Sequence, residues 1–414
     1  MMAKPIGQKS VTIATTIDKF IKTGQTSTVF KNTTVFSNDY IPKHLFFREE
    51  EIQFILSNLT KPFQQITPQN MFIYGPPGTG KTASYRMICS GLNEKAKETG
   101  QQIKYHLINV KYKTLSQAMG DIVKIYAPLK PLKGLGFDDY KNIIESNLKN
   151  GYIGFIFDDL DKIISKYPYT QPIDILVNTF SRLSEHGYKV FICALVNDRT
   201  IEKNFKISTR SAYAPQYLNF RAYNASELSA ILKDRCMRGL KEEAYEEQTI
   251  DDFGTFLYST SRDLRTGQDV ILEAGYQANM ENKTKIVYTD LEKALKKVEQ
   301  DTLIESIVKL DETMLIFFYA IAHIQKENKE AESKAVYDFY CKEITKLNID
   351  KCSTRHLSRN LRPQLEVMGL ISSYRKGHGT RGVPQIFYID EDDLDDTYDI
   401  CKREIQQRIK NNKK

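Results

Sequence analysis

Residues 75–82 read Gly-Pro-Pro-Gly-Thr-Gly-Lys-Thr, which matches the pattern GxxxxGK[ST] of a phosphate-binding loop. The apolar run 71–74 precedes this stretch, and a helix-compatible stretch, 83–92, follows it. Glycines let the backbone curl so that several N–H groups point at one anion, and the dipole of the following helix adds positive potential. The alternative, a glycine-rich turn that binds nothing, is disfavoured by the flanking strand and helix.

The loop pattern assigns chemistry to individual residues. The Lys81 ammonium is expected to reach the β- and γ-phosphates of ATP, and the Thr82 hydroxyl is expected to ligate Mg²⁺. The surrounding backbone would cradle the phosphates, so the predicted nucleotide-binding residues are Gly75, Pro76, Pro77, Gly78, Thr79, Gly80, Lys81, Thr82 and Ala83. The sequence thus predicts a site for ATP or ADP with Mg²⁺.

The composition is that of a globular protein with 414 residues, enough for two or three domains. It contains no apolar run long enough to span a bilayer and no secretory signal peptide, so we expect no membrane partner. Six cysteines without a CxxC pair suggest neither a zinc site nor a disulfide framework. The net charge of +7 allows an anionic partner without requiring one.

Short apolar runs alternate with helical stretches over residues 38–221. They predict five strands of a parallel sheet covered on both faces, at 70–74, 104–110, 152–157, 190–196 and 217–220. Over 222–304 no strand-like run appears, and the spacing of Glu, Lys and Leu predicts an all-helical unit. Residues 1–37 are polar and weakly periodic, so we expect an N-terminal arm.

A third unit is predicted over 305–390. Helices at 305–326 and 332–347 precede a third helix and then a glycine-tipped hairpin, whose arms are 371–375 and 383–389. Three helices followed by such a hairpin are typical of a winged helix. The remaining residues, 391–414, form a charged tail, acidic first and then basic, which we expect to be solvated.

Acidic side chains end the third predicted strand, in the stretch Phe157-Asp158-Asp159-Leu160-Asp161. Ligands bind at the carboxyl ends of strands in open α/β sheets. Asp158 is therefore expected to hold Mg²⁺ through water, and Asp159 to orient the attacking water. The alternative is a solvated acidic turn. The next strand ends in Asn197, which is placed to contact the γ-phosphate or the lytic water, although asparagine at a strand end is most often a turn residue.

Together these motifs resemble those of the AAA+ ATPases, and among them the initiator and licensing family of DNA replication. That family comprises the archaeal origin-binding initiators, the large subunit of the eukaryotic origin recognition complex and the related helicase loader. The resemblance implies an α/β AAA+ core with a five-stranded parallel sheet, an all-helical lid and a C-terminal winged-helix domain. It covers roughly residues 38–390.

The resemblance also implies roles outside the phosphate loop. Asn197 would be the first sensor, Arg265 the second sensor on the lid, and Arg210 an arginine finger. The segment ahead of the loop resembles the family motif near the adenine, which adds Tyr40, Ile41, Pro42 and Arg48 to the nucleotide site. Two positions depart from the family: Arg262 replaces a glycine of the second-sensor motif, and Asp159 replaces the usual glutamate. Aspartate is one methylene shorter, which predicts slow hydrolysis.

The family also carries an insertion that grips the minor groove of DNA, and the matching stretch is 111–140. It places Lys130 and Lys133 beside apolar residues on a glycine-rich turn, which suits phosphate contacts and a wedge. Without the resemblance it is equally a plain loop. The candidate recognition helix, 353–368, is interrupted by Pro363, which predicts a kink or a later start. The third unit adds these candidate DNA-binding residues: Arg355, Arg359, Arg375, Lys376 and Arg381.

The predicted function is an ATP-dependent replication initiator that binds origin duplex DNA and helps to recruit or load the replicative helicase. Its expected partners are origin DNA, the helicase and other initiator subunits, at the archaeal nucleoid in the cytoplasm or in a nucleus. The alternative is an AAA+ protein-remodelling or signalling ATPase whose winged helix binds a protein. A third possibility, suggested by Asp159, is an inert nucleotide-binding subunit of a larger assembly.

Overall fold

The structure, a computed structural model, describes residues 28–37, 40–42, 44–147, 151–163, 172–185, 188–327, 329–347, 349–375 and 385–412. The chain divides into two compact units. One joins Arg48–Ala222 to Glu299–Lys414, and the other joins the N-terminal residues up to Phe47 to Tyr223–Val298.

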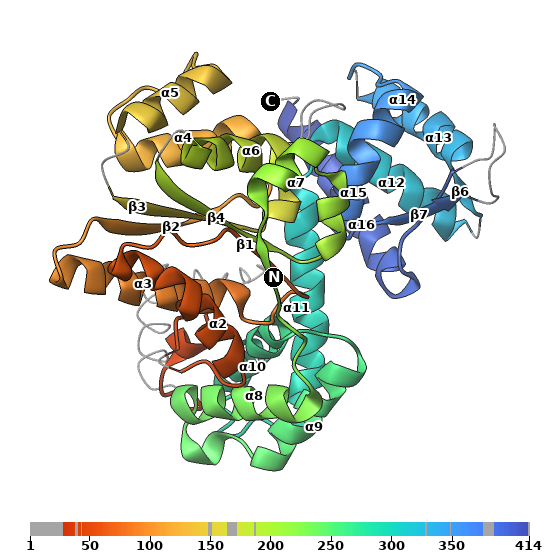
Figure 1. The fold of residues 1–414 in the computed structure, drawn as a ribbon. Helices are drawn as coiled ribbons and strands as arrows, with labels where there is room; N and C mark the ends of the chain where they lie inside the picture. The colour runs from red at the N-terminus through yellow and green to blue at the C-terminus, as the bar shows by residue number, and fades with distance from the viewer. Residues whose placement is uncertain are drawn as a thin grey trace, which may run out of the picture. The chain divides into compact units, whose positions relative to one another are not determined.

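A five-stranded sheet with parallel pairing forms the centre of the first unit (Figure 1). Its strands run in the order β2-β3-β4-β1-β5. Alternate residues of each strand enter opposite cores, so Met71 and Ile73 face one side of the sheet and Phe72 the other. The five predicted strands are confirmed, with the bounds β1 Met71–Tyr74, β2 Ile103–Asn109, β3 Tyr152–Asp158, β4 Lys189–Val196 and β5 Gln216–Asn219.

Helices cover both faces of this sheet, as a parallel sheet with apolar residues on both faces requires. One face packs against α2 (Glu49–Leu59) and α3 (Lys81–Glu98). The other face packs against α4 (Leu115–Tyr126), α5 (Phe137–Asn147), α6 (Pro172–Glu185) and α7 (Ile207–Tyr213). Because β4 lies between β1 and β3, the carboxyl ends of these three strands meet at one edge.

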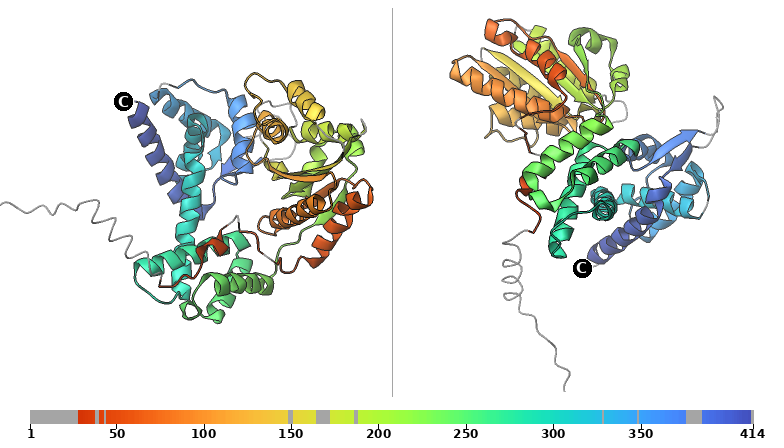
Figure 2. Two further views of the ribbon diagram at one scale, coloured as in Figure 1. Left: turned by 90° about the vertical axis from the view of Figure 1, so that its left-hand side faces the viewer. Right: turned by 90° about the horizontal axis from the view of Figure 1, so that it is seen from below.

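The second unit is helical, as predicted, with α8 (Ala225–Gly239), α9 (Glu247–Ser259), α10 (Leu264–Met280) and the first half of α11 (Tyr288–Val308). Residues 28–36 differ from the expected arm, because they pack into this helical core (Figure 2). The Lys31 and Asn32 N–H groups donate to the Gly239 carbonyl at 2.8 and 2.9 Å. The Phe30 ring packs so closely on Gly275 that a Cβ added to Gly275 would lie 2.3 Å from this ring. This apolar packing makes residues 28–36 part of the helical unit.

The C-terminal part contains α12 (Glu312–Lys326), α13 (Ser333–Lys346) and a small antiparallel sheet of order β6-β8-β7. The strands are β6 (Ala331–Glu332), β7 (Ser372–Arg375) and β8 (Gln385–Tyr388), so the hairpin is confirmed with shorter arms. A single helix over 305–326 is wrong. The helix α11 ends at Val308, and a new helix, α12, begins after Asp311. The Asp311 side chain caps α12 by accepting a hydrogen bond from the Met314 N–H at 2.8 Å.

The candidate recognition helix contains a π-helical turn. It consists of α14 (Thr354–His356), the π turn η6 (Leu357–Leu361) and α15 (Arg362–Val367). Pro363 lies in the first turn of α15, where its missing N–H is tolerated, and the wider turn before it absorbs the conflict. The predicted Lys376 and Arg381 lie outside the described residues.

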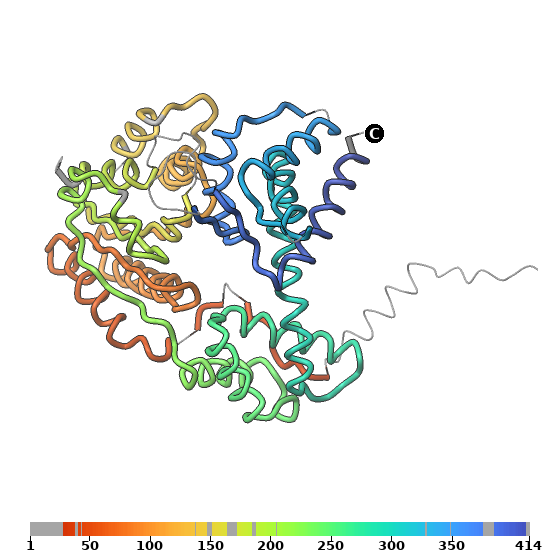
Figure 3. The backbone as a smooth tube through the Cα atoms, turned by 90° about the vertical axis from the view of Figure 1, so that its right-hand side faces the viewer, coloured from red at the N-terminus to blue at the C-terminus, as the bar shows by residue number. Residues whose placement is uncertain are grey.

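The expectation of a solvated charged tail is wrong for α16 (Glu391–Asn412), which packs along α12 (Figure 3). Its Ile400 and Cys401 are buried, and the Arg408 guanidinium donates to the carbonyls of Leu310 and Val308 at 2.8 and 2.9 Å. Acidic residues occupy its first turn and a lysine its last, which suits the helix dipole. Within the described parts of the chain, none of the helices is long and apolar enough to cross a membrane.

Candidate functional site

The backbone of the phosphate loop requires its glycines. Gly78 and Gly80 have φ of 70° and 89°, in the left-handed region that other residues adopt at a cost. A Cβ at Gly75 would lie 2.1 Å from the Phe220 carbonyl oxygen, so only glycine fits at this position, where the residues after β1 and β5 approach each other. The Thr79 hydroxyl donates to the Pro76 carbonyl at 2.9 Å and closes the turn. The glycine conformations and this hydrogen bond give the loop its curled shape.

Lys81 starts α3 and folds back over the loop. Its Nζ donates to the carbonyls of Gly75 at 2.6 Å and Pro76 at 2.8 Å, and the residue is only 8% exposed. These two carbonyl groups hold the positively charged ammonium within the loop. Such a charge next to backbone N–H groups is what an incoming polyphosphate requires.

Thr82 and Asp158 meet across the edge of the sheet. The Thr82 hydroxyl donates to Asp158 Oδ1 at 2.9 Å, and Asp158 ends β3 with 4% exposure. A hydroxyl and a carboxylate are hard oxygen ligands, which together with substrate phosphates are what Mg²⁺ prefers. The two predicted metal ligands therefore fit a magnesium ion chemically.

Asn197 lies between the loop and the acidic strand end, because β4 lies between β1 and β3. Its Oδ1 is 3.4 Å from Lys81 Nζ, and its Nδ2 donates to Asp161 Oδ2 at 3.0 Å. Burial raises the pKa of Asp161, and the negative charge of Asp159 adds to this, while Lys162 acts in the opposite direction. Sequence reasoning assigned no role to Asp161, although it lies in the same acidic stretch.

Asp159 takes a different position from its neighbours. Its φ is 56°, a left-handed value that aspartate tolerates better than most residues. Its Oδ2 is 3.4 Å from Asn109 Nδ2, a long hydrogen bond. The carboxylate predicted to orient water is therefore weakly held in this structure.

Arg48 was predicted to bind nucleotide, but its guanidinium holds backbone carbonyls. It is fully buried, and its Nε donates to the Thr79 carbonyl at 2.9 Å while Nη2 donates to the Arg221 carbonyl at 2.7 Å. Nη1 pairs with Glu51 at 3.2 Å. One side chain thus ties the phosphate loop to the segment that leaves β5.

The other predicted nucleotide contacts lie in the helical unit. Tyr40 packs under the Arg235 guanidinium, 4.6 Å from ring centroid to carbon, while Ile41 is exposed and Pro42 buried. Arg265 is exposed in the first turn of α10. The structure thus places these residues in a different unit from the phosphate loop.

Arg210 belongs to the unit of the sheet, on α7. Its guanidinium donates to the carbonyls of Glu202 at 3.1 Å and Lys203 at 2.9 Å, at the end of η4 (Arg199–Asn204). The side chain is exposed and can therefore be reached by a second molecule. To act on that molecule, the guanidinium would have to release these two carbonyls.

The turn between α4 and α5 divides its apolar residues between core and surface. Leu132 and Leu135 pack against the core of the sheet, whereas Lys130 and Lys133 are exposed. Leu129 is 95% exposed, and no sequence argument singled it out. A leucine that protrudes next to two lysines is the arrangement expected of a wedge.

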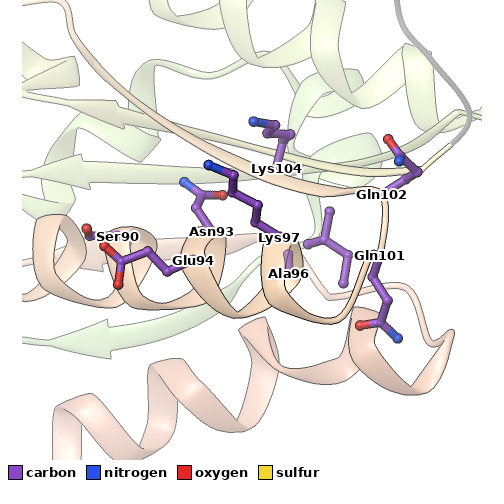
Figure 4. A pocket seen from close by; sticks show the side chains of 10 residues that line it. Ser90, Asn93, Glu94, Ala96, Lys97, Gln101, Gln102 and Lys104 are labelled. Carbon is purple, nitrogen blue, oxygen red and sulfur yellow. The ribbon is translucent and has the colours of Figure 1, made fainter.

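An open depression of about 470 Å³ lies elsewhere on the unit, between the C-terminal half of α3 and β2 (Figure 4). It contains none of the predicted site residues, and along α3 it lies roughly 20 Å from the phosphate loop. Its Asn93 is occupied in pairing with both backbone groups of Tyr105, at 2.9 Å each. This covers part of the open edge of the sheet.

Comparison with known proteins relates the chain to one group. The model of the ATPase family associated with various cellular activities (AAA) matches residues 71–211. An ORC1-type DNA replication protein of Desulfurococcus amylolyticus is 27% identical over 390 residues, covering 92% of this chain and 97% of that protein.

Solved structures share the fold. The Aeropyrum pernix ORC1 protein, solved in complex with DNA, superposes with a TM-score of 0.79 at 20% identity, covering 91% of this chain and 98% of that one. The Aeropyrum pernix ORC2 protein, solved as ADPNP-ADP complexes, gives 0.57 at 18% identity, with 92% and 99% covered. The family resemblance predicted from the motifs is therefore confirmed: the chain is similar to the ORC1-type replication proteins over nearly its whole length and matches the AAA model within it.

Proposed function

We propose that this protein is an ATP-dependent DNA replication initiator, which binds origin duplex DNA and helps to recruit or load the replicative helicase. The observation that carries the proposal is the convergence of Lys81, Thr82, Asp158 and Asn197 at the carboxyl edge of the sheet. The likeness to ORC1-type replication proteins over nearly the whole chain supports it.

The loop from Gly75 to Ala83 would hold the phosphates of ATP or ADP, with Lys81 on the β- and γ-phosphates. Bound Mg²⁺, held by Thr82 and Asp158, would neutralise charge on the phosphates. Asp159 orients the lytic water and Asn197 senses the γ-phosphate. The ADPNP-ADP complexes of the ORC2 relative support a nucleotide at this site. Because Asp159 is short and weakly held, hydrolysis is slow.

The helical unit acts as the lid. The family resemblance implies that Arg265 would touch the γ-phosphate and that Tyr40, Ile41 and Pro42 would lie near the adenine. A lid cation that contacts the last phosphate lets the nucleotide state set the lid angle. Arg210 would act as an arginine finger toward a neighbouring initiator subunit. These roles rest on the family resemblance.

We propose two DNA-binding surfaces. The first is the turn between α4 and α5, where Lys130 and Lys133 would hold phosphates and Leu129 would enter the minor groove. The second is the C-terminal unit 305–390, as a winged helix that presents Arg355 and Arg359 from its recognition helix and Arg375, Lys376 and Arg381 from its hairpin. The ORC1 relative solved in complex with DNA supports DNA as the partner.

Alanine substitutions should separate the two surfaces. We expect the double variants Lys130→Ala/Lys133→Ala and Arg355→Ala/Arg359→Ala each to weaken duplex binding, because each removes cations that would contact DNA phosphates. For every phosphate contact that is lost, the slope of log K against log salt should become shallower by about 0.9. Filter binding of a labelled duplex over a salt series, with ATP and with ADP, measures both quantities. Leu129→Ala should lower affinity with little change of slope, since it removes no charge.

The matched control is Lys95→Ala/Lys97→Ala, which removes two exposed lysines from α3, away from both surfaces. It should leave DNA affinity within about twofold, as expected of surface changes. If binding to duplex DNA is absent or independent of salt, the DNA proposal is wrong. A protein-remodelling ATPase is then favoured.

A further inference from the structure

We propose that Asp161 is a positioning residue for ATP hydrolysis, which acts by fixing the carboxamide of Asn197. The inference rests on the proposed ATPase function and deepens it. It gives Asp161 the task of orienting the sensor Asn197, which is separate from the proposed task of Asp159, to orient the attacking water.

The hydrogen bonds around Asn197 have a defined direction. An ammonium can only donate, so the carboxamide oxygen faces Lys81, at 3.4 Å. An ionised carboxylate can only accept, so the carboxamide nitrogen faces Asp161, at 3.0 Å. With one partner at each end, the flipped carboxamide would set like groups against each other at both contacts.

This orientation matters for a phosphate. The Asn197 nitrogen carries two hydrogens, and Asp161 takes one of them. The second is left to donate to a phosphate oxygen or to the lytic water. A flipped carboxamide would present its oxygen instead and would repel the anion.

The burial of Asp161 argues for function over stability. Its side chain is 12% exposed, and its Oδ1 is buried with no hydrogen-bond partner among the residues that the structure describes. An unpaired buried carboxylate oxygen destabilises a fold, so a purely structural position would favour a neutral side chain. The compensating Lys162 ammonium is 3.9 Å away, beyond a hydrogen bond.

Asp159 cannot take this role in the observed geometry. Its left-handed backbone accompanies a side chain that bonds to Asn109 on the neighbouring strand β2. The short turn η3 (Leu160–Lys162) carries Asp161 on to Asn197. The acid at the third position after Asp158 is thus the one that contacts the sensor.

Single-turnover hydrolysis of radiolabelled ATP by the full chain tests the inference. Asp161→Ala should lower the rate roughly 10- to 100-fold, as removal of an orienting partner does, while ATP affinity stays within about twofold. Asp161→Asn keeps an acceptor oxygen and should recover part of the rate. The control Asp121→Ala, a partly exposed carboxylate on α4 paired with Lys113, should hydrolyse ATP like the wild type.

A double-mutant cycle gives a readout that a merely structural role would not move. If Asp161 acts through Asn197, then Asp161→Ala should cause no further loss in an Asn197→Ala background. If the rate losses of Asp161→Ala and Asn197→Ala multiply in the double variant, the inference is overturned. It is also overturned if Asp161→Ala lowers ATP affinity as much as it lowers the rate. If Asp161→Ala does not fold, Asp161→Asn with and without Asn197→Ala decides in the same way.

The failure of the proposed function looks different. A wild type that binds ATP and never cleaves it would remove hydrolysis from the proposed function, and the role of Asp161 with it. If the wild type cleaves ATP but the rate losses of Asp161→Ala and Asn197→Ala multiply in the double variant, only the role of Asp161 is overturned.

Discussion

Lys81→Ala should abolish ATP-dependent behaviour. The residue supplies a buried positive charge in the phosphate loop, beside the carbonyls of Gly75 and Pro76. Losing one such preorganised donor typically costs roughly 100- to 1,000-fold in rate, and we expect a loss of at least this size in single-turnover hydrolysis. Mg²⁺-ATP should also no longer raise the melting temperature, a stabilisation worth about 2.7 kcal/mol at 100 times Kd in the wild type.

The control for Lys81 is Lys95→Ala, in the same helix. Lys95 is exposed and pairs with Glu98 at 3.1 Å, so its loss should change neither hydrolysis nor the nucleotide-dependent melting shift. If titration of ATP and Mg²⁺ into Lys81→Ala releases the same heat of binding as titration into the wild type, the loop does not hold the triphosphate. The nucleotide site would then lie elsewhere.

Arg48→Ala should strongly destabilise the fold. It leaves the carbonyls of Thr79 and Arg221 without their donor and Glu51 without its partner. The unsatisfied Thr79 carbonyl is buried and costs about 1–3 kcal/mol, and truncation of the fully buried Arg48 side chain leaves a cavity, so we expect a loss of about 3 kcal/mol in the free energy of unfolding. Thermal melting should record a fall of about 5–10 °C. ATP affinity should also fall, since the Thr79 carbonyl belongs to the phosphate loop.

Two variants make the Arg48 result specific. Arg182→Ala removes an exposed arginine from α6 and should melt within about 1 °C of the wild type. Arg48→Lys keeps the charge but loses the planar fork that reaches two carbonyls, so it should recover only part of the stability. If Arg48→Ala melts like the wild type and weakens only ATP binding, Arg48 is a direct nucleotide ligand, as its sequence context indicates.

The charged C-terminal segment contains a helix signal that its composition obscures. Leu394, Tyr398, Cys401 and Ile405 recur at helix spacing and face the apolar core around α12. The many charges between them suggest a solvated tail. Amphipathic helices carry charges on the outer face, so periodicity is the better guide than composition in this segment.

The N-terminal segment shows the opposite case. Val29, Phe30 and Phe36 have no regular period, and nothing near them in sequence offers a core. Their partners include Gly239 and Gly275, more than 200 residues later. Such burial depends on a surface that only the folded helical unit provides, so no local pattern predicts it.

The sequence by itself determined the phosphate loop, the five strands and the acidic strand end, because each depends on residues adjacent in the chain. Tertiary structure decided which of these side chains touch. Strand order places β4 between β1 and β3, and this brings Asn197 to both Lys81 and the acids. The left-handed turn at Asp159 then decides that Asp161 meets Asn197. Pairing order and backbone handedness arise from packing across the whole sheet, so no short stretch of sequence contains them.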